Sequence, residues 1–481
     1  MTAPRTDPLL LPLDLGPLRL RNRILSTAHA PSLAEGGHPR DRYRAYHVEK
    51  ARGGVALTII GGSTNVSPDS RSVFGQLYAG DDSVVPRFRQ LTEEVKAEGA
   101  AVMCQLTHMG RRTVWDDGGW LPVIGPSPTR ERAHRAIPKA MEEAEIARVT
   151  RDFEAAAIRC SAAGFDGIEI LAHGHLLGQF LSPLVNRRDD AWGGDLGNRA
   201  RFLLEVVGRV REAIGPDLAL GVRMTGDERA EGGLTPADCV EIARLLERTG
   251  ALSFLDVIAG APYDHLGLAA WVPPMGMQNL GHLESAAAIR AAVSLPVFVA
   301  GGVNDLATAR FALTEGAADM VGMTRSQIAD PWLVAKLQAG QEDRIRPCVG
   351  LGYCVDRVNK GRAAVCGHNV AAGRERTIPH LVNSEAELGT AKPSLSERRP
   401  RTVVVGGGPA GMEAARVAAL RGQEVHLFEA TPQLGGQLLL AAQSQTRRQI
   451  RSVAVWLEAR SREQAYPSGS TPMPRPRTSS R

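Results

Sequence analysis

Eight short apolar segments, each followed by a helical pattern, recur between residues 24 and 322 of this 481-residue chain. The segments cover residues 24–26, 55–60, 101–105, 167–170, 219–224, 254–258, 297–300 and 320–322. Helical patterns lie between them, for example at 142–163, 199–214 and 305–315, and one begins at Pro236 with Thr235 as its N-cap. Continuous apolar runs are typical of buried parallel strands. We therefore predict an α/β fold with a (β/α)8 TIM barrel over residues 1–340, and an open doubly wound sheet is the structural alternative.

Glycines follow the seventh and eighth of these segments, where TIM barrels commonly bind phosphate. The seventh leads into Gly301 and Gly302, and the eighth into Gly322 and then Arg325. Glycine allows backbone N–H groups to approach a phosphate, and arginine can hold its oxygens with two bonds. This pattern predicts a phosphate site, although two tight turns without a ligand would look similar.

Composition narrows the class of protein. The 57 basic residues are interspersed with 52 acidic ones and the net charge is only +5, so neither a nucleic acid nor a membrane partner is expected. Pro8, Pro12 and Asp14 interrupt the leucines near the N-terminus, so no signal peptide is expected, and no apolar run is long enough to span a membrane. We expect a cytoplasmic protein.

The six cysteines fall into two groups. Cys104, Cys160 and Cys239 lie in apolar segments and are expected to be core thiols, whereas Cys348, Cys354 and Cys366 lie close together in one loop. Six cysteines in so long a chain are too few for a disulfide framework. The close group predicts a metal or iron–sulfur site, and the alternatives are a zinc ion and thiols without a ligand.

A second phosphate-binding pattern follows in the sequence GGGPAG. It lies between a strand at 403–405 and a helix at 410–421, and the next strand at 425–428 leads to Glu429. Gly406, Gly408 and Gly411 would let a pyrophosphate approach, and the carboxylate would bind a ribose.

The space left for this domain is small, because only residues 401–481 follow Pro400 and such a domain usually needs about a hundred or more. We expect a cysteine loop at 341–383, a linker at 384–400, a partial Rossmann-like domain at 401–465 and a disordered tail at 466–481.

Several long segments resemble a known family. NRILSTAHA, QLTHMGRR, the stretch from AGFDGIEI to GNRARF, and VAGGVNDLATAR are similar to the Old Yellow Enzyme superfamily of FMN barrels. With the cysteine loop and GGGPAG, the resemblance narrows to the long-chain NADH:flavin oxidoreductase branch. That branch contains 2,4-dienoyl-CoA reductase, trimethylamine dehydrogenase and bacterial N-methylproline demethylases.

The resemblance implies a set of FMN contacts. Gln105 would bind the flavin pyrimidine edge, and Arg223 would place positive charge where the reduced flavin accumulates negative charge. The remaining contacts would come from Thr27 and Gly61 at the ring and from Gly301, Gly302, Gly322 and Arg325 at the phosphate. Ala30 occupies the position of the flavin-linking cysteine of trimethylamine dehydrogenase, so the FMN should be noncovalent.

Two histidines stand in the loop after the fourth strand, which is one residue shorter than in the family. His175 lies where the family has a proton-donating tyrosine, and His173 matches the second member of its substrate-facing pair. Imidazole transfers protons near neutral pH, so we predict that His175 is an acid/base group and that His173 orients the substrate. The alternative is that one of them only caps the loop.

The cysteine loop resembles the family's four-cysteine set for a [4Fe–4S] cluster, with Leu351 in place of the second cysteine. The resemblance implies Cys348, Cys354 and Cys366 as ligands, with weaker binding than four thiolates would give. Similarly, GGGPAG implies an FAD or NAD(P) site in the partial domain.

Three functions are consistent with this resemblance. The first is FMN-dependent oxidation of a small N-methylated amine or amino acid, with electrons leaving through the cluster to a carrier protein. The second is an NAD(P)H-dependent enoate or 2,4-dienoyl-CoA reductase, and the third is an inactive remnant that only binds flavin. A small-molecule substrate and a homo-oligomer are also expected.

Overall fold

The computed structural model describes residues 7–70, 72–113, 121–132, 135–277, 281–378, 380 and 400–463. The expected linker at 384–400, apart from Pro400, and the expected tail at 466–481 lie outside the described residues. The part of the chain that the structure describes contains no helix that combines the length and the apolarity needed to cross a membrane.

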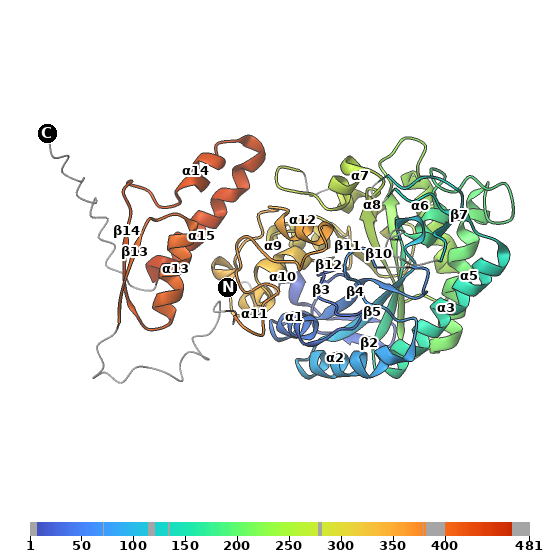
Figure 1. Cartoon of the computed structure of the whole chain (residues 1–481), viewed down its shortest axis with the longest axis horizontal. Helices are drawn as coiled ribbons and strands as arrows, with labels where there is room; N and C mark the ends of the chain where they lie inside the picture. The colour runs from blue at the N-terminus through green and yellow to red at the C-terminus, as the bar shows by residue number, and fades with distance from the viewer. Residues whose placement is uncertain are drawn as a thin grey trace, which may run out of the picture.

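Eight parallel strands close into a barrel (Figure 1), as predicted. In order around the barrel they are β3 (Ile24–Ser26), β4 (Leu57–Asn65), β5 (Ala101–Thr107), β8 (Gly167–Ala172), β9 (Ala219–Asp227), β10 (Phe254–Ala259), β11 (Val297–Ala300) and β12 (Met320–Gly322). The strands are buried on both faces, which explains why they read as continuous apolar runs.

Helices surround the barrel. They are α1 (Asp41–Arg52), α2 (Val85–Ala97), α3 (Glu143–Ala162), α5 (Leu196–Ile214), α6 (Pro236–Arg248), α8 (Gly281–Arg290), α9 (Leu306–Thr314), α10 (Thr324–Ala329) and α11 (Leu333–Gln338). Helix α6 begins as predicted, because Thr235 and Asp238 form a reciprocal capping box. Short elements in the loops are β6 (Ile124–Gly125), β7 (Lys139–Ala140), α4 (Leu176–Leu181), α7 (His265–Trp271) and the 3-10 turn η3 (Gly110–Arg112).

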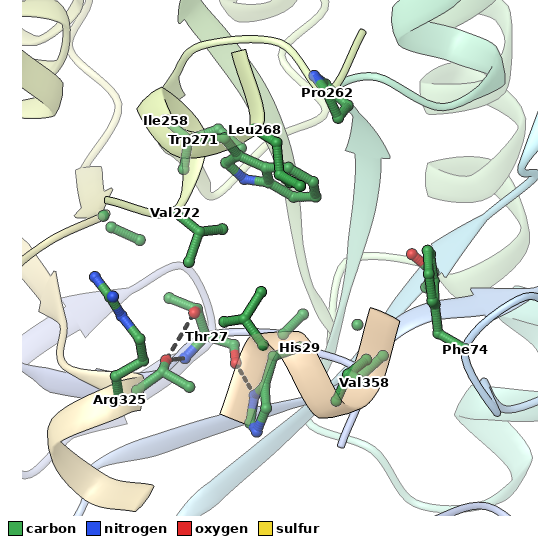
Figure 2. Close-up of a pocket in the computed structure, with 18 of the residues that line it drawn as sticks. Thr27, His29, Phe74, Ile258, Pro262, Leu268, Trp271, Val272, Arg325 and Val358 are labelled. Atoms are coloured by element: carbon green, nitrogen blue, oxygen red, sulfur yellow. Dashed lines mark hydrogen bonds between the residues drawn. The ribbon is translucent and has the colours of Figure 1, made fainter. Parts of the chain in front are cut away.

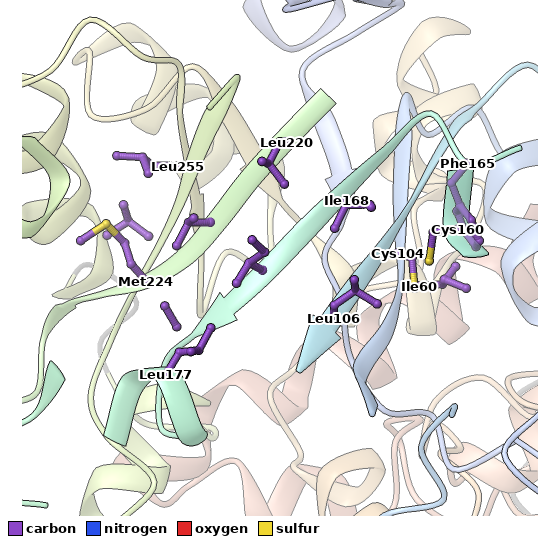
Figure 3. Close-up of a cluster of buried hydrophobic side chains, with 14 of the residues drawn as sticks. Ile60, Cys104, Leu106, Cys160, Phe165, Ile168, Leu177, Leu220, Met224 and Leu255 are labelled. Atoms are coloured by element: carbon purple, nitrogen blue, oxygen red, sulfur yellow. The ribbon is translucent and has the colours of Figure 1, made fainter. Parts of the chain in front are cut away.

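The core has two layers. Inside the barrel, Phe254 stacks on Phe298 with ring centroids 4.5 Å apart, and Leu15 and Leu20 of the hairpin β1 (Leu13–Leu15) and β2 (Leu18–Leu20) join the same cluster. Outside the barrel, apolar side chains fill the space between strands and helices (Figure 3). Cys104, Cys160 and Cys239 are fully buried, which confirms the prediction that they are core thiols.

Residues 400–463 form a smaller C-terminal unit beside the barrel (Figure 1). Two parallel strands pair with each other, β13 (Arg401–Val405) and β14 (Glu424–Phe428), and α13 (Pro409–Leu420) connects them. Two helices follow, α14 (Gln437–Ala441) and α15 (Arg451–Glu463). The unit packs on the segment that leaves the barrel: Trp456 of α15 donates to the Arg344 carbonyl at 3.1 Å, and Arg346 pairs with Glu413 at 3.1 Å. The cysteine loop, with α12 (Tyr353–Asn359), follows directly on this docked segment.

Candidate active site

A cavity of about 660 Å3 lies at the carboxyl-terminal ends of the barrel strands. All the barrel residues predicted for the site line this cavity except Gly61 and His173. The residues in its wall are Thr27, Gln105, His175, Arg223, Gly301, Gly302, Gly322 and Arg325. In Figure 2, Thr27, His29 and Arg325 lie on one side of the cavity, and Leu268 and Trp271 lie on the other. Segments far apart in sequence therefore meet at one place.

The predicted phosphate end has a backbone that only glycine suits. Gly301 and Gly302 have φ values of +120° and +73°. A Cβ atom on Gly301 would lie 2.5 Å from the ring of His282, and a Cβ on Gly322 would lie 2.5 Å from Thr27. A side chain at either position would thus overlap protein atoms of the cavity wall, so the local packing requires glycine.

A chain of buried polar groups lies beneath the cavity. Gln105 donates to Glu169 at 2.7 Å and accepts from the Ser63 N–H at 3.0 Å, which leaves its second amide N–H for a ligand. Arg223 lies 3.5 Å from Asp256, and its Nε has no hydrogen-bond partner among the described residues.

Glu169 and Asp256 are both fully buried, and burial raises the pKa of each carboxyl group. Asp256 also raises the pKa of Glu169, so the two carboxyls are expected to hold a proton between them at neutral pH. The sequence contains a signal for this pair, because the apolar segments FLDVIA and GIEILA each include one acidic residue.

His175 is fixed at the start of α4 and lines the cavity. Its Nδ1 lies 3.0 Å from the Thr107 hydroxyl and 3.4 Å from that of Ser63. These hydroxyls orient the ring, which is the arrangement that a group exchanging protons with a substrate needs.

His173 lies beside the cavity and not in its wall. Its Nδ1 is 2.6 Å from the Thr225 hydroxyl, and its ring packs on Trp271 with centroids 5.0 Å apart. Burial lowers the pKa of His173 well below its ordinary value, with Arg223 and Arg112 acting in the same direction, so this imidazole is neutral. Any effect on substrate would pass through Trp271, and the orienting role stays a prediction.

Gly61 also lies outside the wall, while the neighbouring Gly62 lines it. The Gly61 N–H donates to the Tyr43 hydroxyl at 2.9 Å. Its predicted contact with the flavin ring therefore stays untested by the geometry.

His29, Tyr46 and Lys50 are further polar residues at or near the cavity that were not predicted. His29 lines the cavity, donates from Nδ1 to the Thr27 carbonyl at 2.8 Å and accepts at Nε2 from the Tyr46 hydroxyl at 2.8 Å. The Lys50 ammonium lies 3.3 Å from the same Nε2, and burial lowers the pKa of Lys50 to about 7. The sequence signal was weak, because Tyr46, His47 and Lys50 look like one face of an ordinary helix.

The cysteine loop reaches the cavity through α12, from which Cys354 and Val358 line the wall. Burial and then Cys348 raise the pKa of the Cys354 thiol to about 11, and burial and Cys348 also raise that of Cys366. Leu351 lies against Gly367, next to Cys366: a Cβ on that glycine would be 2.5 Å from the leucine Cδ2. Among the described residues, no three His, Cys, Asp or Glu side chains are arranged to hold a metal ion, so the site predicted at Cys348, Cys354 and Cys366 stays a prediction.

The GGGPAG loop has the predicted strand–loop–helix setting. A Cβ on Gly411 would lie 1.9 Å from the Gly406 carbonyl oxygen, so close packing of the helix requires glycine there. The Glu429 carboxylate accepts from the N–H groups of Gly407 at 2.7 Å and Thr431 at 2.8 Å. These bonds use part of its capacity, and ribose binding stays a prediction.

Comparison with known proteins agrees with this geometry. Residues 8–344 match the NADH:flavin oxidoreductase / NADH oxidase family, and residues 402–454 match the FAD dependent oxidoreductase family. A probable N-methylproline demethylase of Rhizobium meliloti (strain 1021) is 49% identical over 94% of this chain. A multifunctional alkene reductase/demethylase OYE of Caballeronia cordobensis is 44% identical over 95% of it. The chain spans 65% of the length of each of these two relatives.

A solved structure of 2-naphthoyl-CoA reductase in complex with 2-naphthoyl-CoA is similar, with a TM-score of 0.85 and 25% identity, covering 95% of this chain and 70% of its own. The resemblance inferred from the sequence motifs is confirmed. The chain belongs to the NADH:flavin oxidoreductase / NADH oxidase family.

Proposed function

We propose that this chain is an FMN-dependent oxidoreductase that oxidises the C–N bond of a small N-methylated amine or amino acid. The observation that carries the proposal is one cavity that joins the glycine-lined end at Gly301 and Gly302 with His175 and an aromatic wall. Noncovalent FMN fits the residues. Gly301, Gly302 and Arg325 line the end of the cavity where a phosphate would bind. Gln105 keeps a second amide N–H for a ligand, and Arg223 adds positive charge to the wall. The flavin, when bound, supplies a hydride acceptor.

The side chains of this chain would prepare the substrate. An ammonium must lose its proton before hydride can leave the adjacent carbon, and His175, oriented by Thr107, would accept that proton. Trp271 and Leu268 would exclude water from the methyl groups. Loss of hydride from an N-methyl group gives an iminium, and its hydrolysis gives the demethylated amine and formaldehyde.

Cys348, Cys354 and Cys366 would hold an iron–sulfur cluster, which gives the two electrons an outlet to a carrier protein. The position of Cys354 in the cavity wall supports this. Besides burial, Cys348 raises the pKa of both the Cys354 and the Cys366 thiols, which supports the proximity of the three side chains.

A second candidate is alkene reduction, which the name of the Caballeronia relative favours. His175 would then donate a proton to the substrate carbon. The pH dependence separates the two directions: amine oxidation should rise with pH as the ammonium is deprotonated, and alkene reduction should fall.

The test is anaerobic reduction of the bound flavin, followed by absorbance, with N-methylproline, dimethylglycine, trimethylamine and an enoate plus NADH. Bleaching by the methylated compounds supports the proposal. A yellow protein that no donor reduces, or a colourless protein, would support the inactive remnant instead. His175→Phe should slow bleaching roughly 10²–10⁴-fold while the flavin stays bound, and full activity of this variant at every pH would reject the proton-transfer role.

A further inference from the structure

Arg112 lies in the wall of the cavity with its guanidinium almost without partners. The residue is only 6% exposed, and its Nη1 is 3.5 Å from the Pro262 carbonyl oxygen, which is a weak contact. Its Nε is buried and has no acceptor. Within the part of the chain that the structure describes, only one of the five N–H donors of the Arg112 guanidinium therefore has an acceptor, the Pro262 carbonyl oxygen.

The neighbouring Arg111 is equally buried but has more contacts with the protein, although its Nε, like that of Arg112, has no acceptor among the described residues. It donates from Nη1 to the Thr129 carbonyl at 3.3 Å and to the Thr129 hydroxyl at 3.1 Å, and it lies over the Tyr263 ring at 5.1 Å. Two adjacent arginines of one turn, η3, therefore differ: one is held by the protein, and the other faces the cavity.

Among the residues that the structure describes, no carboxylate forms an ion pair with Arg112. Glu228 accepts from the Ser182 hydroxyl at 2.8 Å, the Leu234 N–H at 2.8 Å and the Tyr263 hydroxyl at 2.9 Å. Burial lowers the pKa of the Arg112 guanidinium, whereas Glu131 acts on it electrostatically and raises that pKa. A buried guanidinium in this position is costly unless an anion completes its bonds.

The rest of the wall suits the other end of a small amino acid. Phe74, Leu268, Trp271 and Val272 present apolar surface to the cavity (Figure 2). N-methyl groups can pack there while a carboxylate reaches Arg112 from the same molecule, and guanidinium and carboxylate match as two parallel hydrogen bonds.

We propose that Arg112 binds the substrate carboxylate, so that the substrate class is an N-methylated α-amino acid and not a simple N-methylamine. The inference rests on the proposed amine oxidation and narrows its substrate. Arg112 is then the residue that sets specificity.

The test compares two substrates that differ only at this group, N,N-dimethylglycine and N,N-dimethylethylamine. In Arg112→Gln, kcat/KM for dimethylglycine should fall roughly 10- to 100-fold, mainly through KM, since one charge-assisted contact is of that size. The value for dimethylethylamine should change little. Arg112→Lys keeps the charge but not the paired hydrogen-bond geometry. Its kcat/KM for dimethylglycine should therefore lie between those of the wild type and Arg112→Gln, and its kcat/KM for dimethylethylamine should change little.

Arg111→Gln is the matched control, because it removes an equally buried guanidinium from the same turn. It should lower the melting temperature without changing the ratio of the two kcat/KM values. If Arg112→Gln does not fold, the ratio of the two kcat/KM values in Arg112→Lys tests the inference in its place.

Binding gives a readout that needs no turnover. Trimethylglycine and tetramethylammonium cannot lose a proton from nitrogen, and they differ by the carboxylate. Calorimetry should show that the wild type prefers trimethylglycine and that Arg112→Gln loses the preference.

Equal losses for both substrates, an unchanged ratio, or equal binding of the two probes would overturn the inference. A wild type that oxidises neither amine rejects the proposed function instead, and the two probes still decide whether Arg112 binds a carboxylate.

Discussion

Replacing Gly301 with alanine should disrupt the cavity from its phosphate end. The φ of +120° is one that alanine adopts only with strain, and the new Cβ would lie 2.5 Å from the His282 ring. That ring is held on both sides, since its Nδ1 accepts from the Ala259 N–H at 2.9 Å and its Nε2 donates to the Ala270 carbonyl at 2.9 Å. If His282 moves, both bonds are lost.

The expected cost is the sum of two effects. Backbone strain contributes about 1–3 kcal/mol and two lost hydrogen bonds about 0.5–1.5 kcal/mol each, for a total of about 2–6 kcal/mol. Gly340→Ala is the matched control: its φ is +70° and no atom lies within 4 Å of the added Cβ, so it should cost only about 1–2 kcal/mol.

Denaturant unfolding followed by circular dichroism measures the stability, and absorbance after gel filtration measures the retained flavin. Gly301→Ala should lose both stability and flavin, whereas Gly340→Ala should keep its flavin. Adding His282→Ala to Gly301→Ala should recover part of the flavin, because the overlap is removed. If Gly301→Ala unfolds like Gly340→Ala and keeps its flavin, the assignment of this loop to the phosphate is wrong.

Two further changes test groups described above. The raised pKa of Glu169 means that the folded chain binds more protons than the unfolded chain around neutral pH, so this group lowers stability as pH rises, by up to about 1.4 kcal/mol per pH unit. Glu169→Gln cannot titrate, and its melting temperature relative to the wild type should rise between about pH 5 and about pH 8 and then level off; a constant difference would show that Glu169 is ionised in the folded chain. Leu351→Cys should increase the iron and sulfide retained after anaerobic purification, because it places a fourth thiolate beside Cys366. Stoichiometric zinc without sulfide in either protein would refute the cluster.

The barrel could be predicted because burial on both faces leaves a simple mark in the sequence. β3, β11 and β12 begin and end at the predicted residues. β4 differs, since it starts at Leu57 and continues to Asn65 through two glycines, where the pairing with β5 shifts register. A register shift depends on the partner strand, so the sequence of one strand cannot reveal it.

The site was predicted in part for a similar reason. Residues at strand ends, such as Gly301 and Gly322, could be found because strand ends converge in a barrel. His173 and His175 look alike in sequence, yet only His175 lines the cavity. Arg112 was missed because its lack of partners depends on Pro262 and on loops distant in the chain.

Docking of α15 couples two parts of the chain. Trp456 packs against His368, with ring centroids 5.3 Å apart, and His368 follows Cys366 closely in the cysteine loop. Because the two parts share this packing, docking of α15 and ordering of the cysteine loop stabilise each other. The docked helix stabilises the ordered loop by the same free energy by which the ordered loop stabilises the docked helix. The resistance of α15 to proteolysis therefore reports on how well ordered the loop with the three cysteines is.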